Sequence, residues 1–478
     1  MTAAPGGALP ERVHPTPLPR VAGRAPRILS LVYRDPDHDS RVLKTAATLE
    51  EAGAEVLVVG LAPYTLDLPE GRDRTPEGVE VFRTRDLDLT RTFSTATRVW
   101  RRLTGRDPRT GAPQQRELPP PDAPAAPAAS AGRAGTQLGA RARAAYTDAF
   151  RVARLVRYWA GAVSVGRRYG ADVVHANDGN TLVPALVLKA VQGAGIVYDS
   201  HELWLRRNIR PRPVAPYVEA AIEAVGIRAA DAVVTVSSSI ADWLQQHYGL
   251  ADRPSLVRNI PVWGGRLPDP SSGRLRELAG LAAQDRVVSY CGGIAPGRGL
   301  EETIDALALL PDDVHLVMLG PGGEDYLAGL RARADARGVG ERVHRAPAVP
   351  GHEVPSTLAD ADLAVVYVRP VCLSYVFSLP NKLFESIHAG LPIVAADLPD
   401  TAALVREHGL GEVFGAETAA DLAAALARVL EDPGAHRDAV AALAPTLDWR
   451  REAERLVAAH AHALRSTGRR PAVGGSVP

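Results

Sequence analysis

Cysteine and long apolar runs are both scarce in this 478-residue chain. The two cysteines, Cys291 and Cys372, lie in apolar segments, which suits buried thiols in a reducing compartment and argues against a disulfide framework. No run approaches the roughly 20 apolar residues needed to cross a bilayer. The Pro-, Gly- and Ala-rich segment 1–24 lacks the apolar centre of a signal peptide. We therefore expect a cytoplasmic protein.

Net charge is also absent, since 55 basic residues balance 55 acidic ones. A neutral chain has no global field that draws it to polyanions, so we expect no nucleic-acid partner. Lysine is rare among the basic residues, because Lys44, Lys189 and Lys382 are the only lysines in a background of arginine. An ammonium acts on phosphate as a point charge, whereas a guanidinium is a planar fork with its own geometric demands. Lys382 is therefore a candidate phosphate ligand.

The apolar content of 46% is enough for two domains with extensions. Short buried strands alternate with amphipathic helices, a pattern typical of parallel sheets in doubly wound α/β domains. In the first series we expect strands at 28–33, 55–59, 172–176, 196–198 and 232–236, and helices at 40–51, 141–168 and 181–192. In the second we expect strands at 287–290, 315–319, 343–344, 364–368 and 393–395, and helices at 300–310, 324–337, 355–359, 419–431 and after 381.

The domain boundaries follow from these two series. We expect disordered tails at 1–25 and 467–478, a first domain at 26–263, a second at 264–445 and a terminal helix within 446–466. Residues 104–140 are mostly Pro, Ala, Gly and Arg and cannot bury enough apolar surface to fold, so a disordered insertion is expected there. Ligands of doubly wound sheets bind outside the carboxyl ends of the strands, and we expect the site in a cleft between the two domains.

A glycine-rich turn follows the first strand of the second series. Gly292 and Gly293 end this strand, and Arg298 and Gly299 precede the next helix. Glycines let the backbone approach a ligand closely, and a helix start offers unpaired amides to an anion. A purely structural turn is an equal alternative. The turn is not a dinucleotide fingerprint, because Glu302 stands where the last glycine is expected, so an oxidoreductase is disfavoured.

A second loop leads into a helix through Ser378, Leu379, Pro380, Asn381, Lys382 and Glu385. It supplies a second cation at a second helix start, so two crossovers of one domain are expected to converge on one anion. Glu385 lies three residues after Lys382 and close to the same helical face, where a carboxylate can accept two hydroxyl hydrogen bonds from a ribose. An ion pair between Lys382 and Glu385 within the helix is the alternative.

Over about 27–464 these motifs resemble the retaining glycosyltransferases of family 4, in the branch that reads Pro-Asn-Lys-x-Phe-Glu. The resemblance implies the GT-B fold, with two facing Rossmann-like domains and a terminal helix that crosses back onto the first domain. It implies that Arg298 and Lys382 hold the diphosphate of a nucleotide-sugar donor and Glu385 its ribose. The remaining donor-side residues implied are Gly292, Gly293, Gly299, Ser378, Leu379, Pro380 and Asn381.

The likeness is incomplete at one position. The first glutamate of the family's signature falls on Phe377, so a carboxylate contact to the donor sugar is absent. A uridine base is a family-level expectation. Fixed cations and helix amides would stabilise charge on the leaving diphosphate, so we expect neither a metal nor a cofactor.

In the first domain, the loop after the first strand resembles the family segment that borders the acceptor site, which implies acceptor roles for Asp39 and Ser40. A calcium loop is disfavoured, because Ser40 replaces the required glycine and Ala46 the required glutamate. A helix cap by Asp39 or Ser40 is the alternative to an acceptor role.

A histidine at the end of the strand 196–198 corresponds in the family to one that points toward the anomeric carbon. The resemblance therefore implies a catalytic place for His201, with Glu202 as its companion on the acceptor side. Asp178 ends the neighbouring strand and is expected to orient His201 or to bind an acceptor hydroxyl. A surface hydrogen bond between His201 and Glu202 is the alternative.

Arginines at 91–109 and 141–157, interleaved with apolar residues, indicate either peripheral contact with anionic lipid at the inner membrane face or a solvated surface. For the whole chain we expect a hexosyltransferase that acts on the hydroxyl of a glycan, a lipid-linked glycan or a small molecule in polysaccharide or glycoconjugate synthesis. A catalytically silent scaffold that binds a sugar nucleotide, and a sugar-nucleotide epimerase or hydrolase, are the alternatives.

Overall fold

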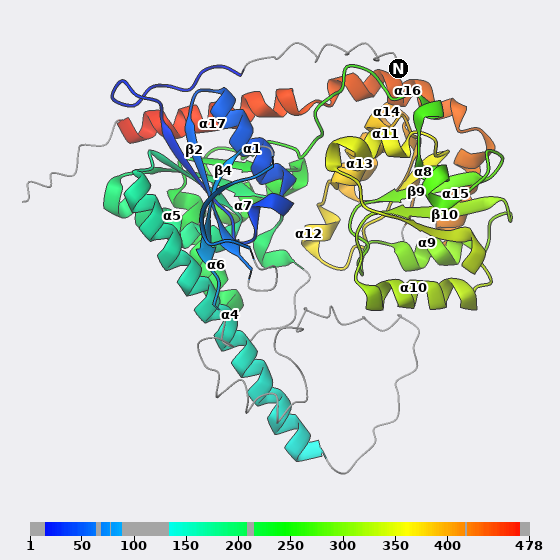
Figure 1. Ribbon diagram of the computed structural model, residues 1–478, viewed down its shortest axis with the longest axis horizontal. Coiled ribbons are helices and arrows are strands. Elements are labelled where there is room, and N and C mark those ends of the chain that lie inside the picture. Colours follow the sequence, from blue (N-terminus) through cyan, green and yellow to red (C-terminus); the bar gives the residue numbers. More distant parts are fainter. Residues whose placement is uncertain are drawn as a thin grey trace, which may run out of the picture. The chain divides into compact units, whose positions relative to one another are not determined.

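The computed structural model describes residues 15–63, 68–76, 78–87, 133–207, 215–415 and 418–468, without the side chains of His38 and of 133–147. These residues form two largely parallel β-sheets flanked by helices, which confirms the α/β prediction (Figure 1). By their contacts they divide into two compact units, one mainly from Arg20–Glu50 and Ala54–Ile196 and the other mainly from Val197–Ala463. The domain boundary expected between 263 and 264 and the cleft expected between two domains stay predictions.

The first sheet has eight strands in the order β3-β4-β2-β1-β5-β6-β7-β8. They are β1 (Arg27–Leu31), β2 (Glu55–Ala62), β3 (Gly71–Arg74), β4 (Glu80–Arg85), β5 (Val173–Asn177), β6 (Gly195–Ser200), β7 (Ala232–Thr235) and β8 (Ser255–Leu256). Strand β1 pairs in parallel with β2 and β5, so that Ile28 is in register with Val56 and with Val173. All three side chains are buried, as expected for a parallel sheet that is covered on both faces.

The helices connected to this sheet are α1 (Ser40–Glu51), α4 (Arg133–Tyr169), α5 (Leu182–Gln192), α6 (Ala215–Ala229) and α7 (Ser238–Tyr248). The Asp39 carboxylate caps α1 by accepting a hydrogen bond from the Val42 N–H at 3.2 Å. Helix α4 packs closely at Gly166, where any side chain would overlap Leu188 of α5 and Leu29 of β1. This close approach holds α4 and α5 together.

The insertion expected at 104–140 is wrong in its last part. Helix α4 begins at Arg133, so residues 133–140 are helical, while 104–132 lie outside the described residues. The sequence from 133 is rich in alanine and arginine and free of proline, which favours a helix even where few large apolar residues are present. Helix propensity, and not apolar content alone, therefore decides the structure of 133–140.

The tail expected at 1–25 is also wrong for its described part. The Leu18 side chain is buried, and its backbone N–H donates a hydrogen bond to the Ala52 carbonyl at 2.9 Å. Arg24 forms two hydrogen bonds with the Asp172 carboxylate, at 2.7 and 2.9 Å. A backbone bond and an ion pair therefore fix a segment whose Pro and Gly content had suggested disorder.

The second sheet has six parallel strands in the order β11-β10-β9-β12-β13-β14. They are β9 (Arg286–Cys291), β10 (Val314–Leu319), β11 (Val343–Ala346), β12 (Leu363–Val366), β13 (Ile393–Ala396) and β14 (Gly411–Phe414). Side chains of β9 alternate between two cores: Val288 and Tyr290 enter one, Val287 and Cys291 the other. Figure 1 shows α9 and α10 on one side of β9 and β10, and α11 and α13 on the other.

The helices of this part are α8 (Leu275–Ala279), α9 (Leu300–Leu307), α10 (Glu324–Ala336), α11 (Val354–Leu358), α12 (Leu373–Val376), α13 (Asn381–His388), α14 (Pro399–His408), α15 (Ala419–Glu431), α16 (Gly434–Leu443) and α17 (Trp449–Gly468). Glu452 of α17 is fully buried and lies 2.6 Å from Arg258. The helix extends to Gly468, two residues beyond the predicted end, and 469–478 lie outside the described residues. That α17 crosses back onto the first domain stays a prediction. Of the described helices, none has both the length and the apolar character that a membrane span needs.

Candidate functional site

A pocket of about 380 Å³ lies where the chain leaves the carboxyl ends of β6, β7 and β9, within the unit that contains Val197–Ala463. We call it the strand-end pocket. Its walls are His201, Glu202, Val236, Ile240, Tyr290, Cys291, Gly292, Gly293, Arg298, Ser374, Tyr375, Ser378, Leu379, Pro380, Asn381, Lys382 and Glu385. The structure therefore brings both predicted cations, Glu385 and His201 into one pocket, at the position where parallel sheets bind ligands.

The glycine turn after β9 supplies one wall. Gly292 has a positive φ of 108°, which a residue with a side chain rarely adopts, and it lines the pocket together with Gly293. Gly299, expected on the donor side, is not part of the wall. A Cβ at Gly299 would overlap the ring of Tyr367, so the absence of its side chain makes room for this tyrosine at the start of α9.

Lys382 stands in the first turn of α13, and its side chain is buried. Its Nζ lies 4.0 Å from the centre of the Tyr290 ring and donates a hydrogen bond to the Tyr367 carbonyl at 3.3 Å. Burial, and after it the nearby Arg298 guanidinium, lowers the pKa of Lys382 to about 7. An anion beside Nζ would offset the cost of the buried charge, so the site is suited to receive negative charge.

Arg298 is placed by an aromatic side chain from another segment of the wall. Its Cζ lies 5.4 Å from the centre of the Tyr375 ring of α12, a distance at which a guanidinium is attracted to the face of the ring. The backbone beside it is fixed too, because the Arg369 N–H donates to the Gly297 carbonyl at 3.1 Å. Arg298 and Lys382 therefore reach the pocket from two different crossovers.

Glu385 lies one helical turn after Lys382, and its Oε2 accepts a hydrogen bond from the Cys291 Sγ at 3.4 Å. Burial, followed by the Glu385 charge, raises the pKa of the Cys291 thiol well above its ordinary value. Cys291 is therefore a neutral thiol that donates to the carboxylate, and it is not a nucleophile. The contact helps to fix the Glu385 side chain at the wall.

His201 follows the last residue of β6, and its Nε2 lies 3.3 Å from the Asp199 Oδ2. The Asp199 side chain is fully buried, whereas that of His201 is 17% exposed. A buried carboxylate beside an imidazole fixes the orientation of the ring. The sequence analysis named Asp178 as a candidate for orienting His201, and the carboxylate beside the ring in the structure is that of Asp199. Glu202, next in the wall, pairs with Arg207 at 3.5 Å.

Phe377 stands where the family resemblance leads one to expect a glutamate, and the structure shows what its backbone does. The Phe377 carbonyl accepts a hydrogen bond from the Ser237 Oγ at 2.7 Å. Ser237 is also the N-cap of α7, since its Oγ accepts from the Ile240 N–H. The loop before α13 is thereby attached to the start of α7.

The other acceptor-side predictions lie in the other compact unit. Asp39 and Ser40 stand at the start of α1, and Asp178 follows β5 with a positive φ of 60°. The Asp178 carbonyl accepts a hydrogen bond from the Thr181 hydroxyl at 3.0 Å. The cap predicted as an alternative for Asp39 is present, and the acceptor roles stay predictions.

Sequence reasoning missed several residues of this site, namely Asp199, Val236, Ile240, Tyr290, Cys291, Ser374 and Tyr375. A signal existed for Asp199, because it lies two residues before His201 and alternate residues of an extended segment share a side. Tyr290 directly precedes the Gly-Gly turn, so a place under the turn could have been inferred. No signal in the sequence linked Tyr375 to Arg298, because that contact depends on the path of α12.

Comparison with known proteins gives matches along both series of strands. The Glycosyltransferase Family 4 model matches residues 119–260, and the Glycosyl transferases group 1 model matches residues 273–444. A D-inositol 3-phosphate glycosyltransferase of Mycolicibacterium vanbaalenii is 28% identical over 201 residues, which are 40% of this chain and 43% of that protein. The chain spans less than half the length of the curated relatives it matches.

Solved structures match over nearly the whole chain. A sucrose-phosphate synthase of Thermosynechococcus elongatus aligns with a TM-score of 0.64 at 16% identity, covering 93% of this chain and 98% of that one. Anabaena HepE, solved in complex with UDP-glucose, aligns with a TM-score of 0.61 at 18% identity, covering 90% and 98%. At these identities the likeness shows the fold alone. The shared fold and the two domain matches place this chain among the GT-B glycosyltransferases of group 1 and family 4.

Proposed function

We propose that this chain is a retaining hexosyltransferase that moves a sugar from a nucleoside diphosphate donor to an acceptor hydroxyl. The observation that carries the proposal is that Arg298, Lys382, Glu385 and His201 line one pocket at the strand ends. The UDP-glucose bound to Anabaena HepE supports a UDP-sugar donor. The pocket is the candidate donor site.

In this proposal Arg298 and Lys382 hold the diphosphate, and the backbone of Gly292 and Gly293 allows it to approach closely. Glu385 accepts hydrogen bonds from the ribose hydroxyls, helped by the nearby Cys291 thiol. Ser378, Leu379, Pro380 and Asn381 complete the donor wall.

The reaction breaks the bond between the anomeric carbon and the diphosphate oxygen and forms a bond from the acceptor oxygen to the same face of that carbon. The acceptor's proton passes to the leaving diphosphate. Negative charge grows on the diphosphate as the bond breaks, so cations fixed there stabilise the transition state more than the ground state. His201, oriented by Asp199, lies on the side proposed for the sugar. No metal or cofactor takes part in this proposal.

The acceptor is proposed to be a hydroxyl of a glycan, a lipid-linked glycan or a small molecule, in polysaccharide or glycoconjugate synthesis. Asp39, Ser40, Asp178 and Glu202 are the candidate acceptor-side residues. The name of the Mycolicibacterium relative makes D-inositol 3-phosphate a reasonable first member of an acceptor panel.

The test measures nucleotide release from a panel of nucleotide sugars with and without acceptors, followed by assignment of the product's anomeric configuration. We expect acceptor-dependent release of UDP, a retained configuration, and large losses in Arg298→Ala and Lys382→Ala. Arg331→Ala, an exposed arginine of α10, is the matched control and should keep wild-type rates. Unchanged turnover in both pocket variants, or an inverted product, would refute the assignment.

A catalytically silent sugar-nucleotide-binding scaffold is the second candidate, because Phe377 stands where a donor-sugar carboxylate is expected. Calorimetry separates the two: UDP-sugar binding without turnover across a broad acceptor panel would favour the scaffold. In that case Phe377→Glu is the informative variant, since the hydrogen bond at this position uses the backbone carbonyl and survives the change.

A further inference from the structure

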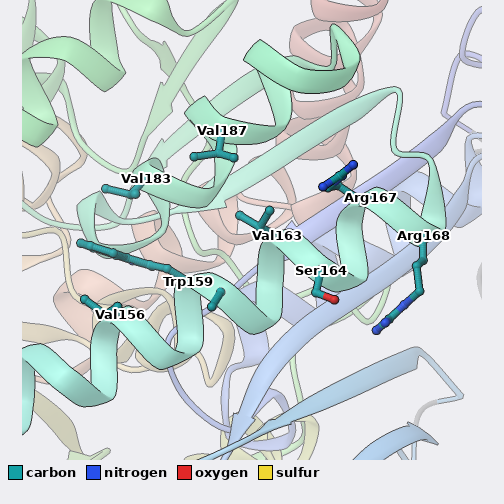
Figure 2. Close-up of a pocket in the computed structure, with 9 residues that line it drawn as sticks. Val156, Trp159, Val163, Ser164, Arg167, Arg168, Val183 and Val187 are labelled. Atoms are coloured by element: carbon teal, nitrogen blue, oxygen red, sulfur yellow. The ribbon is translucent and has the colours of Figure 1, made fainter. Parts of the chain in front are cut away.

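An apolar groove of about 750 Å³ runs between α4 and α5, in the unit that does not contain the strand-end pocket. Figure 2 shows Val183 and Val187 of α5 on one side and Val156, Trp159 and Val163 of α4 on the other. Arg167 and Arg168 stand at one end of the groove (Figure 2). The groove is therefore apolar along its length and cationic at one end.

Several valines of this face are exposed to solvent. Val156 is 49% exposed, Val187 36%, and their helix neighbours Val152 and Val191 57% and 55%. Helix α4 is nonetheless well packed on its other face, where Tyr158 is fully buried. The exposed valines are thus a second apolar face rather than a poorly packed core, and contiguous exposed apolar surface of this kind marks an interaction site.

The surface is also rigid. Trp159 bridges the two helices by donating its indole N–H to the Asn180 carbonyl at 2.7 Å, just before α5. Gly166 brings α4 against Leu188 of α5 with no room for a side chain. A partner would therefore meet a preformed groove.

The two helices that line the groove carry basic residues and no acidic ones over this stretch. At its outer side Arg168 also lines a neighbouring pocket that contains Glu50, Glu55 and Glu80. The sequence holds no Asp or Glu from Ala149 to Ala171 or from Leu182 to Gln192. Among the described residues, Arg167 and Arg168 form no ion pair or hydrogen bond, whereas Arg154 is neutralised by two hydrogen bonds to the Asp86 carboxylate, at 2.5 and 2.7 Å. The positive charge available to a partner is therefore concentrated beside the groove.

The position of Arg167 and Arg168 differs from the membrane contact that the sequence predicted at 91–109 and 141–157. Residues 91–109 and the side chains at 141–147 lie outside the described part of the chain. Within 148–157, Arg154 is paired, and Arg157 donates to the Arg85 carbonyl at 3.2 Å. The face with available charge lies further along α4, at Arg167 and Arg168.

Charge distinguishes the possible occupants of the groove. A second copy of the same face would bring two cationic rims together, and like charges at close range disfavour contact. The chain's own segment 91–109 carries six arginines and one aspartate, so it is disfavoured for the same reason. An anionic lipid surface offers both an apolar interior for the valines and negative phosphates for the arginines.

We propose that the α4–α5 groove is a docking surface for an anionic lipid bilayer. The valines and Trp159 enter the boundary between headgroups and acyl chains, and Arg167 and Arg168 contact lipid phosphates. This inference does not depend on the donor pocket, and nucleotide binding can be measured separately in every variant.

The test is co-sedimentation of the full chain with vesicles of phosphatidylcholine alone or of phosphatidylcholine mixed with phosphatidylglycerol. We expect binding to the mixed vesicles and little binding to the neutral ones. Arg167→Gln with Arg168→Gln should weaken binding about 25-fold, since each basic residue near an anionic surface contributes roughly fivefold. Val156→Glu with Val187→Glu should weaken it about tenfold or more.

The matched control uses two exposed valines of α6, Val218 and Val225, which are 51% and 59% exposed. Val218→Glu with Val225→Glu adds the same charge elsewhere and should leave vesicle binding unchanged, and UDP binding should be unchanged in all three variants. The proposal is overturned if the wild-type chain does not bind anionic vesicles, or if the α6 variant loses as much vesicle binding as the groove variants. It is also overturned by a lipid-free dimer that Val156→Glu with Val187→Glu dissociates.

Discussion

The strand-end pocket and the α4–α5 groove place their cations in opposite environments. In the pocket, Lys382 is buried against the Tyr290 ring, and Arg298 is placed over the Tyr375 ring. In the groove, Arg167 and Arg168 are exposed beside a row of valines. Positive charge is therefore held against aromatic rings in the pocket and beside exposed valines in the groove.

The difference shows what each arrangement can do. A buried cation is desolvated and fixed, so an anion that reaches it gains strongly from a single geometry. An exposed cation is hydrated and screened, so it attracts negative surfaces broadly with little geometric selection. The pocket is suited to one diphosphate, and the groove to a surface made of many headgroups.

The largest contrast is expected when each pair of cations is removed. Alanine at Arg298 or at Lys382 should lower transfer about 10²–10³-fold, as for loss of one fixed donor at a developing charge. Arg167→Ala with Arg168→Ala should leave transfer to a soluble acceptor within about twofold, because exposed surface charges contribute little. Steady-state transfer rates with one nucleotide sugar and one acceptor test this prediction. Equal losses of transfer from the pocket and the groove substitutions would contradict it.

The frame of the pocket can be tested without touching a charge. Gly299→Ala forces a side chain into the Tyr367 ring at a φ of 73°, so unfolding in urea should show a loss of about 2 kcal/mol or more. UDP affinity should fall too, because the Tyr367 carbonyl accepts the Lys382 hydrogen bond. The control is Gly293→Ala in the same turn, where a Cβ meets no atom within 4 Å and stability should be unchanged. Equal stability of the two variants would contradict the packing argument.

The pH dependence of UDP binding should report the buried lysine. Because the pKa of Lys382 is lowered to about 7, the ammonium is lost above that pH, and affinity should fall up to about tenfold per pH unit. Calorimetry in buffers of different ionisation enthalpy should show proton uptake on binding. Lys382→Ala gives the baseline that contains the titration of UDP itself, and a matching slope in that variant would exclude Lys382.

The lowered pKa of Lys382 also determines how the stability of the fold changes with pH. The pKa of Lys382 is lowered from an ordinary value of 10.5, so the unfolded chain binds more protons between about pH 7 and 10.5. This residue alone should therefore make the fold more stable as the pH rises through that window. Lys382→Met, which keeps much of the volume without the charge, should remove this part of the pH dependence.

The smallest effect concerns salt. Raising the ionic strength from about 0.1 M to about 0.5 M shortens the screening length from about 10 Å to about 4 Å, which should weaken vesicle binding about fivefold. UDP binding should change by about twofold or less, since buried charges are screened less. A stronger salt effect on UDP than on vesicles would reverse the comparison between pocket and groove.

The sequence predicts the parts of this molecule that depend on short-range patterns. Buried apolar segments predicted the central strands of both sheets, whereas β3, β4, β8 and β14 were missed. The Gly-Gly turn and the later Pro-Asn-Lys segment predicted the two walls of the pocket that carry Arg298 and Lys382. Such features are local, because a buried strand or a helix start is encoded by adjacent residues.

What the sequence does not predict depends on long-range packing. The Tyr375 contact with Arg298 and the Ser237 contact with the Phe377 carbonyl join segments that are far apart in the chain. The lowered pKa of Lys382 depends on how deeply α13 is covered, which no residue near it encodes. The α4–α5 groove was missed because exposed valines and buried valines look alike in a sequence.

The Ser237 hydroxyl has a single proton, which it gives to the Phe377 carbonyl while its oxygen receives the Ile240 N–H. Asp400 of α14 accepts a hydrogen bond from the neighbouring Ser239 N–H at 3.2 Å. The Phe377 loop, the start of α7 and α14 are therefore joined by one hydrogen-bond cluster, which we call the latch. Any displacement of the loop that carries Phe377 must break this latch or pull α7 along with it. If the proposed donor site is correct, the rate of nucleotide release would then depend on Ser237, a residue outside the pocket wall.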